Sequence, residues 1–461
     1  MIKVKMMLKK NDDLEYMLGA PEAAIRHMIV PFLISIIVVQ INVFADTFWV
    51  SGLGIDAVSG MTSAVPMYSI FVNIGIGLSV GVVATIAYRI GKGDRKTASN
   101  IAGSAIISAI LLSVICSVIV FFLTDPIIDI MGAQDVRSQI KDYMLPFIFL
   151  SPILVLNTVF GGLLRAEGSA KRSTIVQMSA AIFNMILDPL LIYGLGFGLM
   201  GAGLATVLAS CFGLIIAIYW YVRKRTVISI GKEDFTFRTD IQKELMTVAG
   251  PRTLEGMVMS VVILFQRVFI IVASGTVGVS LFNVPFRYVA LSMCPSEATG
   301  MAMVPVAAAA YGQDDLQKMK KGMIYALKLA MIFSLVLMVF LFIFSDPLIS
   351  LFTMEESMQE WKYAFLWNMR MYCIILPFFT IQTIGSSMLQ AMKRSKRPME
   401  ITMILGVARL LLFWIASGYD YQAITYALIF SYVLSAILMI FMARYEFGKL
   451  CSKSAEPVPT S

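Results

Sequence analysis

The fold is decided by residues 60–96, which read GMTSAVPMYSIFVNIGIGLSVGVVATIAYRIGKGDRK. The first part, residues 60–87, contains no charged residue, and four basic residues follow between positions 89 and 96. A helix over 60–87, rising 1.5 Å per residue, is long enough to cross about 30 Å of hydrocarbon. A long uncharged stretch closed by a basic cluster indicates a transmembrane helix that ends on the cytoplasmic side.

The same pattern recurs along the whole chain. Lys and Arg residues collect in every second gap between apolar stretches: the even gaps hold 20 of them and the odd gaps hold three. The positive-inside rule therefore predicts that the even gaps and both termini are cytoplasmic. The twelve predicted spans are residues 27–50, 60–87, 101–123, 143–163, 174–193, 200–222, 246–273, 279–310, 323–344, 363–392, 398–417 and 422–446.

Composition excludes several classes of protein. Charged residues make up 14 % of the chain and hydrophobic residues 58 %, which leaves too little polar surface for a soluble protein of this size, where charged residues are roughly 25 %. The net charge of +8 lies in short loops, so no nucleic-acid partner is expected. The single histidine, His27, and five dispersed cysteines argue against an enzyme. The chain lacks a Gly-x-x-x-x-Gly-Lys-Ser/Thr motif, which disfavours an ATP-driven pump.

The two halves of the chain repeat each other. Thr124-Asp125-Pro126 recurs as Ser345-Asp346-Pro347, an offset of 221 residues. Six spans per half is an even number, so both halves enter the membrane from the same side and form a parallel repeat. We predict an all-α membrane protein with twelve transmembrane helices in two six-helix lobes related by pseudo-two-fold symmetry. The predicted parts are an N-terminal segment 1–26, an N-lobe 27–222, a linker 223–245, a C-lobe 246–446 and a tail 447–461, with segment, linker and tail cytoplasmic.

Two carboxylates in the N-terminal half lie inside predicted spans. An acidic residue at mid-membrane costs about 2.5–3.5 kcal/mol on insertion scales, so each requires a reason. Asp46 and Asp188 lie four and five residues before the outer ends of their spans, roughly 6–8 Å below the outer boundary. Either one has a structural alternative: Asp188 precedes Pro189 and could cap a broken helix, and Asp46 could join two helices.

Polar residues reach the same level from neighbouring spans. Asn184 lies four residues before Asp188 and therefore on the same helix face. Tyr143 and Thr206 reach a similar depth, whereas Asn157 lies deeper. Oxygen ligands of this kind suit a proton or a hard cation such as Na⁺, and desolvation with mutual repulsion favours proton uptake by the acids.

Three segments carry a family resemblance. Residues 44–50, FADTFWV, follow Pro31; residues 184–189 read NMILDP; and residues 201–206 read GAGLAT. Together they resemble the MATE family of multidrug and toxic compound extrusion transporters, most closely its archaeal and DinF-like branch. The resemblance implies two six-helix lobes and cation-coupled efflux by alternating access.

The resemblance also implies roles for single residues. Asp46, Tyr143, Asn184, Asp188 and Thr206 match an N-lobe proton or Na⁺ site, to which the depth argument adds Asn157. With Na⁺, the ligands would be Asp46, Asp188, Asn184 and Thr206. Pro31 favours a kink in the first span, and matches a proline whose bending could accompany transport, although a static kink is equally consistent.

The C-terminal half carries different charges. Arg267, Arg287 and Glu297 lie within predicted spans, and Glu255 lies near the cytoplasmic end of the seventh. One interpretation is a structural bridge between Arg287 and Glu297; the other is a cavity wall that tolerates anions. The tenth span, 363–392, contains no acidic residue, so ion coupling in the C-lobe is not expected.

These observations predict a secondary active multidrug efflux transporter of the plasma membrane. It would exchange H⁺ or Na⁺ for amphipathic, often cationic organic compounds, with no cofactor besides the coupling ion. Its expected partners are small-molecule drugs or lipophilic substrates and membrane lipids, and it would act as a monomer. The alternatives are a lipid or lipid-linked oligosaccharide flippase, favoured by the C-lobe arginines, and a non-transporting receptor or channel.

Overall fold

The computed structural model describes residues 13–350 and 359–455. Residues 1–12 of the predicted N-terminal segment and residues 456–461 of the predicted tail lie outside this described part. Within it the chain is helical, and twelve helical stretches are long and apolar enough to cross a membrane. The predicted number of spans is therefore confirmed.

The helices follow one another in chain order with short connections. The N-terminal half contains α2 (Pro21–Ser51), α3 (Ile55–Gly91), α4 (Arg95–Met131), α5 (Arg137–Ala166), α6 (Ala170–Pro189) and α7 (Gly198–Val222). The C-terminal half contains α8 (Thr239–Gly312), α9 (Leu316–Ile343), α10 (Ser345–Ser350), α12 (Lys362–Cys373), α13 (Ile375–Ala391), α14 (Lys396–Ser417) and α15 (Tyr421–Ala455). Short turns lie between some of them, namely η1 (Gln134–Val136), η2 (Leu190–Gly194) and η3 (Lys232–Asp234).

The label α8 covers two membrane spans, Thr239–Gly275 and Val277–Gly312, which a sharp turn separates. Its backbone leaves the helical region only at Ser274 and Gly275, where Gly275 has a φ of 60°. Only glycine adopts that conformation at little cost, so Gly275 reverses the chain between the seventh and eighth spans. Helix α8 also begins at Thr239, which makes the last seven residues of the predicted linker helical.

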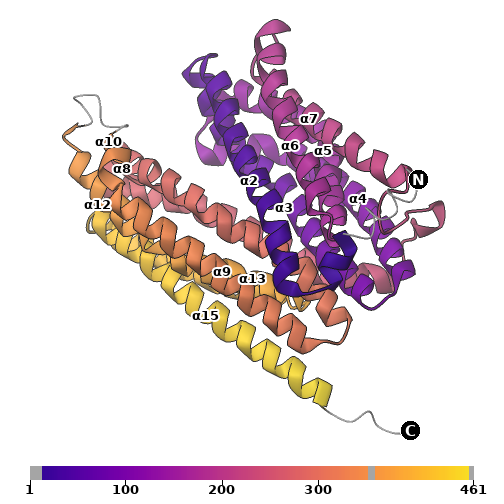
Figure 1. Ribbon diagram of the computed structural model, residues 1–461. Helices are drawn as coiled ribbons and strands as arrows, with labels where there is room; N and C mark the ends of the chain where they lie inside the picture. The colour runs from indigo at the N-terminus through magenta and orange to yellow at the C-terminus, as the bar shows by residue number, and fades with distance from the viewer. Residues whose placement is uncertain (1–12, 351–358, 456–461) are drawn as a thin grey trace.

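The two lobes share a core at one end only. This end, called the basic end below, carries the loops rich in Lys and Arg. There one buried cluster contains Ile86 and Ala87 of α3 together with Ala307 and Ala308 of α8. Toward the opposite end the N-lobe and the C-lobe have separate cores. Figure 1 shows the consequence: α2 to α7 diverge from α8 to α15 away from the basic end.

Glycines make the shared core tight. A Cβ atom at Gly81 of α3 would lie 2.8 Å from the Cβ of Ala249 on α8. On the other span of α8, Gly312 packs on the backbone of Tyr88, and the rings of Tyr88 and Tyr311 are 5.1 Å apart. Small residues allow helices in a membrane to approach closely, so these positions let α3 and α8 hold the lobes together.

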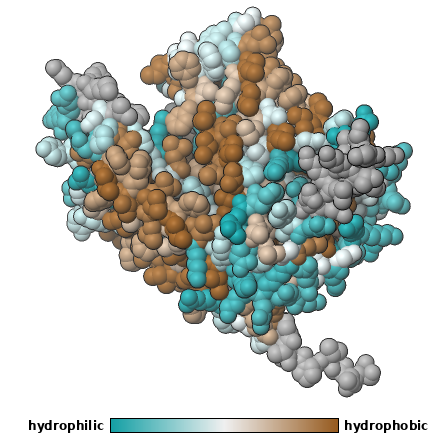
Figure 2. Space-filling model, viewed as in Figure 1, coloured by the Kyte–Doolittle hydropathy of each residue, from teal (hydrophilic) through white to brown (hydrophobic). Residues whose placement is uncertain are grey.

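The surface agrees with a membrane location. Large apolar side chains are exposed along α4, α9 and α14, for example Phe122 at 71 %, Ile343 at 64 % and Trp414 at 64 %. Figure 2 shows hydrophobic residues along the lengths of the helices, with hydrophilic residues gathered toward the end where α15 finishes. The protein is therefore a multi-pass membrane protein.

Candidate functional site

Asp46 and Asp188 are joined by a chain of amides between α2 and α6. The Asn42 side-chain amide donates to the Asn184 side-chain oxygen at 2.8 Å and to the Asp46 carboxylate at 3.4 Å. The Asn184 amide in turn donates to the Asp188 carboxylate at 3.1 Å. The spacing of four residues within each helix puts each Asn directly below its Asp. Asn42, which the predicted site did not include, is thus the residue that links the two helices.

The site lacks positive charge. One oxygen of Asp46 and one oxygen of Asp188 are buried without a hydrogen-bond partner, as is the side-chain oxygen of Asn42. The two carboxyl groups lie within interaction range of each other, and no Lys or Arg of the described residues forms an ion pair with either. A buried acceptor without a donor is costly. A proton or a hard cation bound here would supply the positive charge that no described side chain provides to these oxygens.

Two tyrosines lie beside this pair. Tyr143 of α5 and Tyr68 of α3 are both near Asp46, and both pack against the ring of Phe147, at 5.1 Å and 4.7 Å. Tyr143 was predicted from its depth. Tyr68 was not, because a single tyrosine in a long apolar stretch gives no sign of which way it faces.

Two predicted residues make their contacts elsewhere. The Thr206 hydroxyl donates to the Ala202 carbonyl of its own helix at 3.2 Å. The side-chain oxygen of Asn157 faces α7, where a Cβ atom on Gly213 would approach it within 2.9 Å, and it has no hydrogen-bond partner. The structure therefore brings together Asp46, Asp188 and Asn184 by direct contacts, and places Thr206 and Asn157 outside that chain of hydrogen bonds.

The helix that carries Asp188 widens just after it. Pro189 has no N–H to donate, and residues Leu190–Gly194 form a π-helical turn, a feature frequent at functional sites. The Tyr193 hydroxyl at its end donates to the Trp49 carbonyl of α2, and the two rings are 6.3 Å apart. Because the chain stays helical past Asp188, the alternative in which Asp188 caps a broken helix end is wrong.

Pro31 lies inside α2, which stays helical over its whole length. A proline at this position removes one backbone hydrogen bond and leaves the carbonyl of residue 27 without its helical partner. The helix therefore has a weak point about 22 Å from Asp46, at 1.5 Å per residue.

The C-lobe charges do not form the predicted bridge. The Arg287 guanidinium lies 5.2 Å from the ring of Phe44, on α2 of the other lobe, and no ion pair joins it to Glu297 in the described chain. Ten residues along one helix separate the two by about 15 Å, which explains why they do not meet. Glu297 instead lies near Arg252, which pairs with Glu255 at 3.7 Å.

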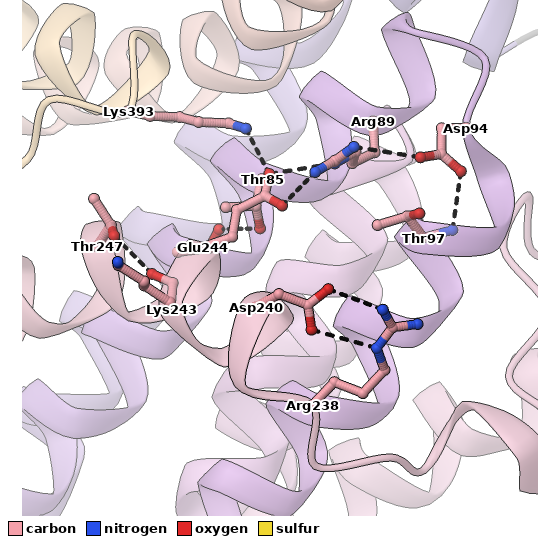
Figure 3. Close-up of polar contacts among 11 residues, drawn as sticks. Thr85, Arg89, Asp94, Thr97, Arg238, Asp240, Lys243, Glu244, Thr247 and Lys393 are labelled. Atoms are coloured by element: carbon pink, nitrogen blue, oxygen red, sulfur yellow. Dashed lines mark hydrogen bonds and ion pairs between the residues drawn. The ribbon is translucent and has the colours of Figure 1, made fainter.

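A second charged site joins the lobes at the basic end, and Figure 3 shows it. Glu244 of α8 accepts hydrogen bonds from Arg89 of α3 at 2.5 Å and from Lys393, in the loop after α13, at 2.7 Å. Arg89 also pairs with Asp94 at 3.3 Å. The Lys393 ammonium lies 3.5 Å from the ring of Tyr88. All the charges of this network are compensated, so it ties α3 to the C-lobe.

Glu167 is another buried carboxylate, in the loop between α5 and α6. It accepts hydrogen bonds from the backbone N–H groups of Val227 and Ile228, at 2.9 Å and 3.2 Å, and from the Tyr221 hydroxyl at 3.1 Å. Burial raises the pKa of Glu167 to about 7, although these hydrogen bonds oppose the shift. The carboxylate thereby anchors the segment that leads from α7 to the C-lobe.

Comparison with known proteins agrees with this architecture. The family model MatE matches residues 31–190 and residues 251–415, one segment in each lobe. The chain belongs to the MatE family. It is also similar to a crystal structure of MATE in complex with MaL6, with a TM-score of 0.91, 27 % sequence identity, and coverage of 96 % of this chain and 99 % of that one.

Several known transporters resemble the chain over most of its length. The FAD transporter of Shewanella oneidensis is 26 % identical over 76 % of this chain and 77 % of its own. The multidrug export protein MepA of Staphylococcus saprophyticus is 22 % identical over 91 % of this chain and 93 % of its own. A MOP superfamily transporter from Pyrococcus furiosus, described as having a binding pocket of reverse polarity, has a TM-score of 0.89 at 27 % identity and covers 95 % of this chain and 98 % of that one.

Proposed function

We propose that this protein is a secondary active efflux transporter that exchanges H⁺ or Na⁺ for amphipathic organic compounds. The observation that carries the proposal is the pair Asp46 and Asp188, two membrane carboxylates held by amides and left without a cation of the protein. Ionisable residues inside the membrane are expensive and mark ion pathways. The multidrug export protein MepA and the probable multidrug resistance protein NorM of Thermotoga maritima, both similar to this chain, support a drug-exporting role.

The coupling ion supplies enough energy for this role. A membrane potential contributes about 2.3 kcal/mol per charge per 100 mV, and a tenfold gradient adds about 1.4 kcal/mol. Together they amount to about 3.7 kcal/mol. One coupling ion could thus sustain a concentration ratio of roughly a hundredfold or more for a neutral compound.

The transport cycle follows from the way in which the lobes meet. We propose that the basic end and both termini are cytoplasmic, as the positive-inside rule requires, so that the arrangement with lobes joined at the basic end is open to the outside. A cation or proton bound by the carboxyl pair would neutralise it and change the packing of α2 against α6. Pro31 would let α2 bend in response, and the protein would work as a monomer.

Reconstituted vesicles test the proposal. We expect efflux of ethidium to be driven by a pH gradient or by a Na⁺ gradient, imposed separately, and to be lost in both Asp188→Asn and Asp46→Asn. Asp346→Asn is the matched control, because Asp346 is a surface carboxylate of the C-lobe that pairs with Lys362 at 3.0 Å. Ion coupling at this site would be refuted if the efflux rate did not change with either gradient. It would also be refuted if Asp46→Asn and Asp188→Asn both exported ethidium at the wild-type rate.

A flippase for lipids or lipid-linked oligosaccharides is the second candidate, because Arg267 and Arg287 could bind a phosphate-bearing headgroup. A flippase function predicts that transport depends on the C-lobe arginines and not on the carboxyl pair. Lipid translocation would continue in Asp188→Asn and be lost in Arg267→Ala, as measured by the exposure of a fluorescent phospholipid to an external quencher.

A further inference from the structure

The two lobes present opposite charges to each other. The six predicted spans of the N-lobe contain Asp46 and Asp188 and no Lys or Arg. In the C-lobe, residues 256–296 contain Arg267 and Arg287 and no acidic residue. Glu297 follows Arg287 by ten residues and therefore lies about 15 Å nearer the basic end. This outer part of α8, residues 256–296, is called the C-lobe wall below, and its charged residues are all positive.

Arg287 extends from the C-lobe toward the N-lobe. Its guanidinium lies 5.2 Å from the ring of Phe44, two residues before Asp46, and both side chains are exposed. Within the described chain no carboxylate pairs with Arg287. A guanidinium stacked on a ring keeps N–H donors at its edge, where they match a carboxylate or phosphate.

Arg267 lies on the face of α8 that is turned to the N-lobe. Ser260, seven residues earlier and so on the same face, accepts a hydrogen bond from Asn73 of α3 at 3.2 Å. The lobes diverge beyond that contact, and Arg267 is exposed there with no carboxylate partner among the described residues. By helix rise, Arg267 and Arg287 lie about 12 Å and about 18 Å from the turn at Gly275, so about 6 Å in depth separates them.

A third arginine adds to the positive charge behind α8. Arg409 of α14 is only 6 % exposed, and its guanidinium lies 4.6 Å from the ring of Tyr432. Helix α14 packs on α8 one turn away, where a Cβ atom on Gly406 would meet Val262 at 3.0 Å. No acidic residue of the described chain forms an ion pair with Arg409, so no carboxylate cancels its charge.

We infer that the transported compounds include aromatic organic anions, whose acidic group is bound by Arg287 and Arg267 while their ring packs against Phe44. The acidic group would be a carboxylate, sulfonate or phosphate, because these fit the forked donors of arginine. This inference rests on the proposed transport function and specifies the substrate class. It assigns recognition to the C-lobe wall and leaves ion exchange to the carboxyl pair of the N-lobe.

The test compares two dyes of opposite charge on the full-length protein in vesicles, carboxyfluorescein and ethidium. We expect the wild type to bind and export carboxyfluorescein, and Arg287→Gln or Arg267→Gln to raise its Kd at least tenfold while binding of ethidium is unchanged or tighter. Arg287→Lys should retain part of the affinity because it keeps the charge and loses the fork. Arg370→Gln is the control, since Arg370 donates to Ser345 at 3.1 Å and lies over Phe342, away from Phe44.

Three results would overturn the inference: no binding of carboxyfluorescein by the wild type, equal losses for both dyes in Arg287→Gln and Arg267→Gln, or no effect of these variants on either dye. The proposed ion coupling is tested separately by Asp188→Asn. If that variant exports both dyes normally, the coupling proposal fails, whereas the charge selectivity of Arg287 is judged by dye binding alone. If the arginine variants leave both dyes unaffected, the substrate class is wrong and ion coupling still stands on its own test.

Discussion

The carboxyl pair of the N-lobe and Glu244 at the basic end are both carboxylates in helices, yet their surroundings are opposite. Glu244 is held between Arg89 and Lys393 at 2.5 Å and 2.7 Å. Asp46 and Asp188 have only amide donors, and each keeps an oxygen without a partner. A carboxylate compensated by fixed cations has little to gain from an external one, whereas an uncompensated pair has much to gain. Glu244 is therefore suited to joining helices, and the pair to exchanging an ion.

The largest effect on transport is expected at the carboxyl pair, whose charge no Lys or Arg of the described residues compensates. Asp188→Asn removes a charge that the fold does not need, so we expect ion-driven efflux to fall at least a hundredfold while thermal stability stays the same or rises. Vesicle transport and a melting curve in detergent measure the two quantities. A variant that melts early would show instead that Asp188 stabilises the fold, and the contrast with Glu244 would fail.

Glu244→Gln should lower thermal stability, which Asp188→Asn should leave unchanged or raise. It leaves Lys393 without an anionic partner and leaves Arg89 with Asp94 alone. We therefore expect a loss of about 2 to 3 kcal/mol in the stability of the closed basic end. The change would appear as a lower melting temperature and as faster labelling of a cysteine placed at Ala309, which packs on Gly91 of the other lobe.

Asp240→Asn is the control for that measurement, and Figure 3 shows Asp240 with its partner Arg238. Asp240 also pairs with an arginine, Arg238, at 3.0 Å, but both side chains are largely exposed. An exposed pair contributes little because water screens it, so we expect no measurable change in melting temperature or in cysteine labelling. Equal effects of Glu244→Gln and Asp240→Asn would mean that the inter-lobe network does not hold the lobes.

At Glu167 we expect a smaller effect, a pH dependence in the docking of the loop that contains Val227 and Ile228. Burial raises its pKa to about 7 from the usual 4.5, so the docked loop binds a proton more readily than the free one. Its contribution to docking is thus fully present below about pH 4.5 and is lost as pH rises through about 7. Amide exchange at Val227 and Ile228, corrected for intrinsic pH dependence, should show this loss, and Glu167→Gln should remove it. Exchange with the same pH profile in the variant would assign the effect to another group.

Much of the fold could be predicted because hydrophobic length and loop charge are local signals. The exact residue of the turn in α8 is an exception, since both Gly275 and Gly278 lie between the seventh and eighth predicted spans. The inter-lobe network could not be foreseen either: Arg89 and Glu244 are 155 residues apart, and nothing in the sequence indicates that two charged residues at span ends will meet.

The site could be predicted only in part, because spacing along one helix is a local signal and contacts between helices are not. Asn184 and Asp188 share one helix, so their spacing places them together. Thr206 was assigned by depth, but depth fixes the level of a residue and leaves its direction open; its hydroxyl turns to Ala202. Arg287 was paired with Glu297 because both lie on the eighth span, and the contact with Phe44 depends on how the lobes meet.

Ion binding by the purified protein tests the central claim most directly. Proton uptake and radioactive Na⁺ binding would be measured on the wild type and on the double variant Asp46→Asn, Asp188→Asn. We predict saturable uptake of one of the two ions by the wild type and its loss in a double variant that remains folded. Uptake of the same ion, in the same amount and with the same affinity, by both proteins would contradict the account.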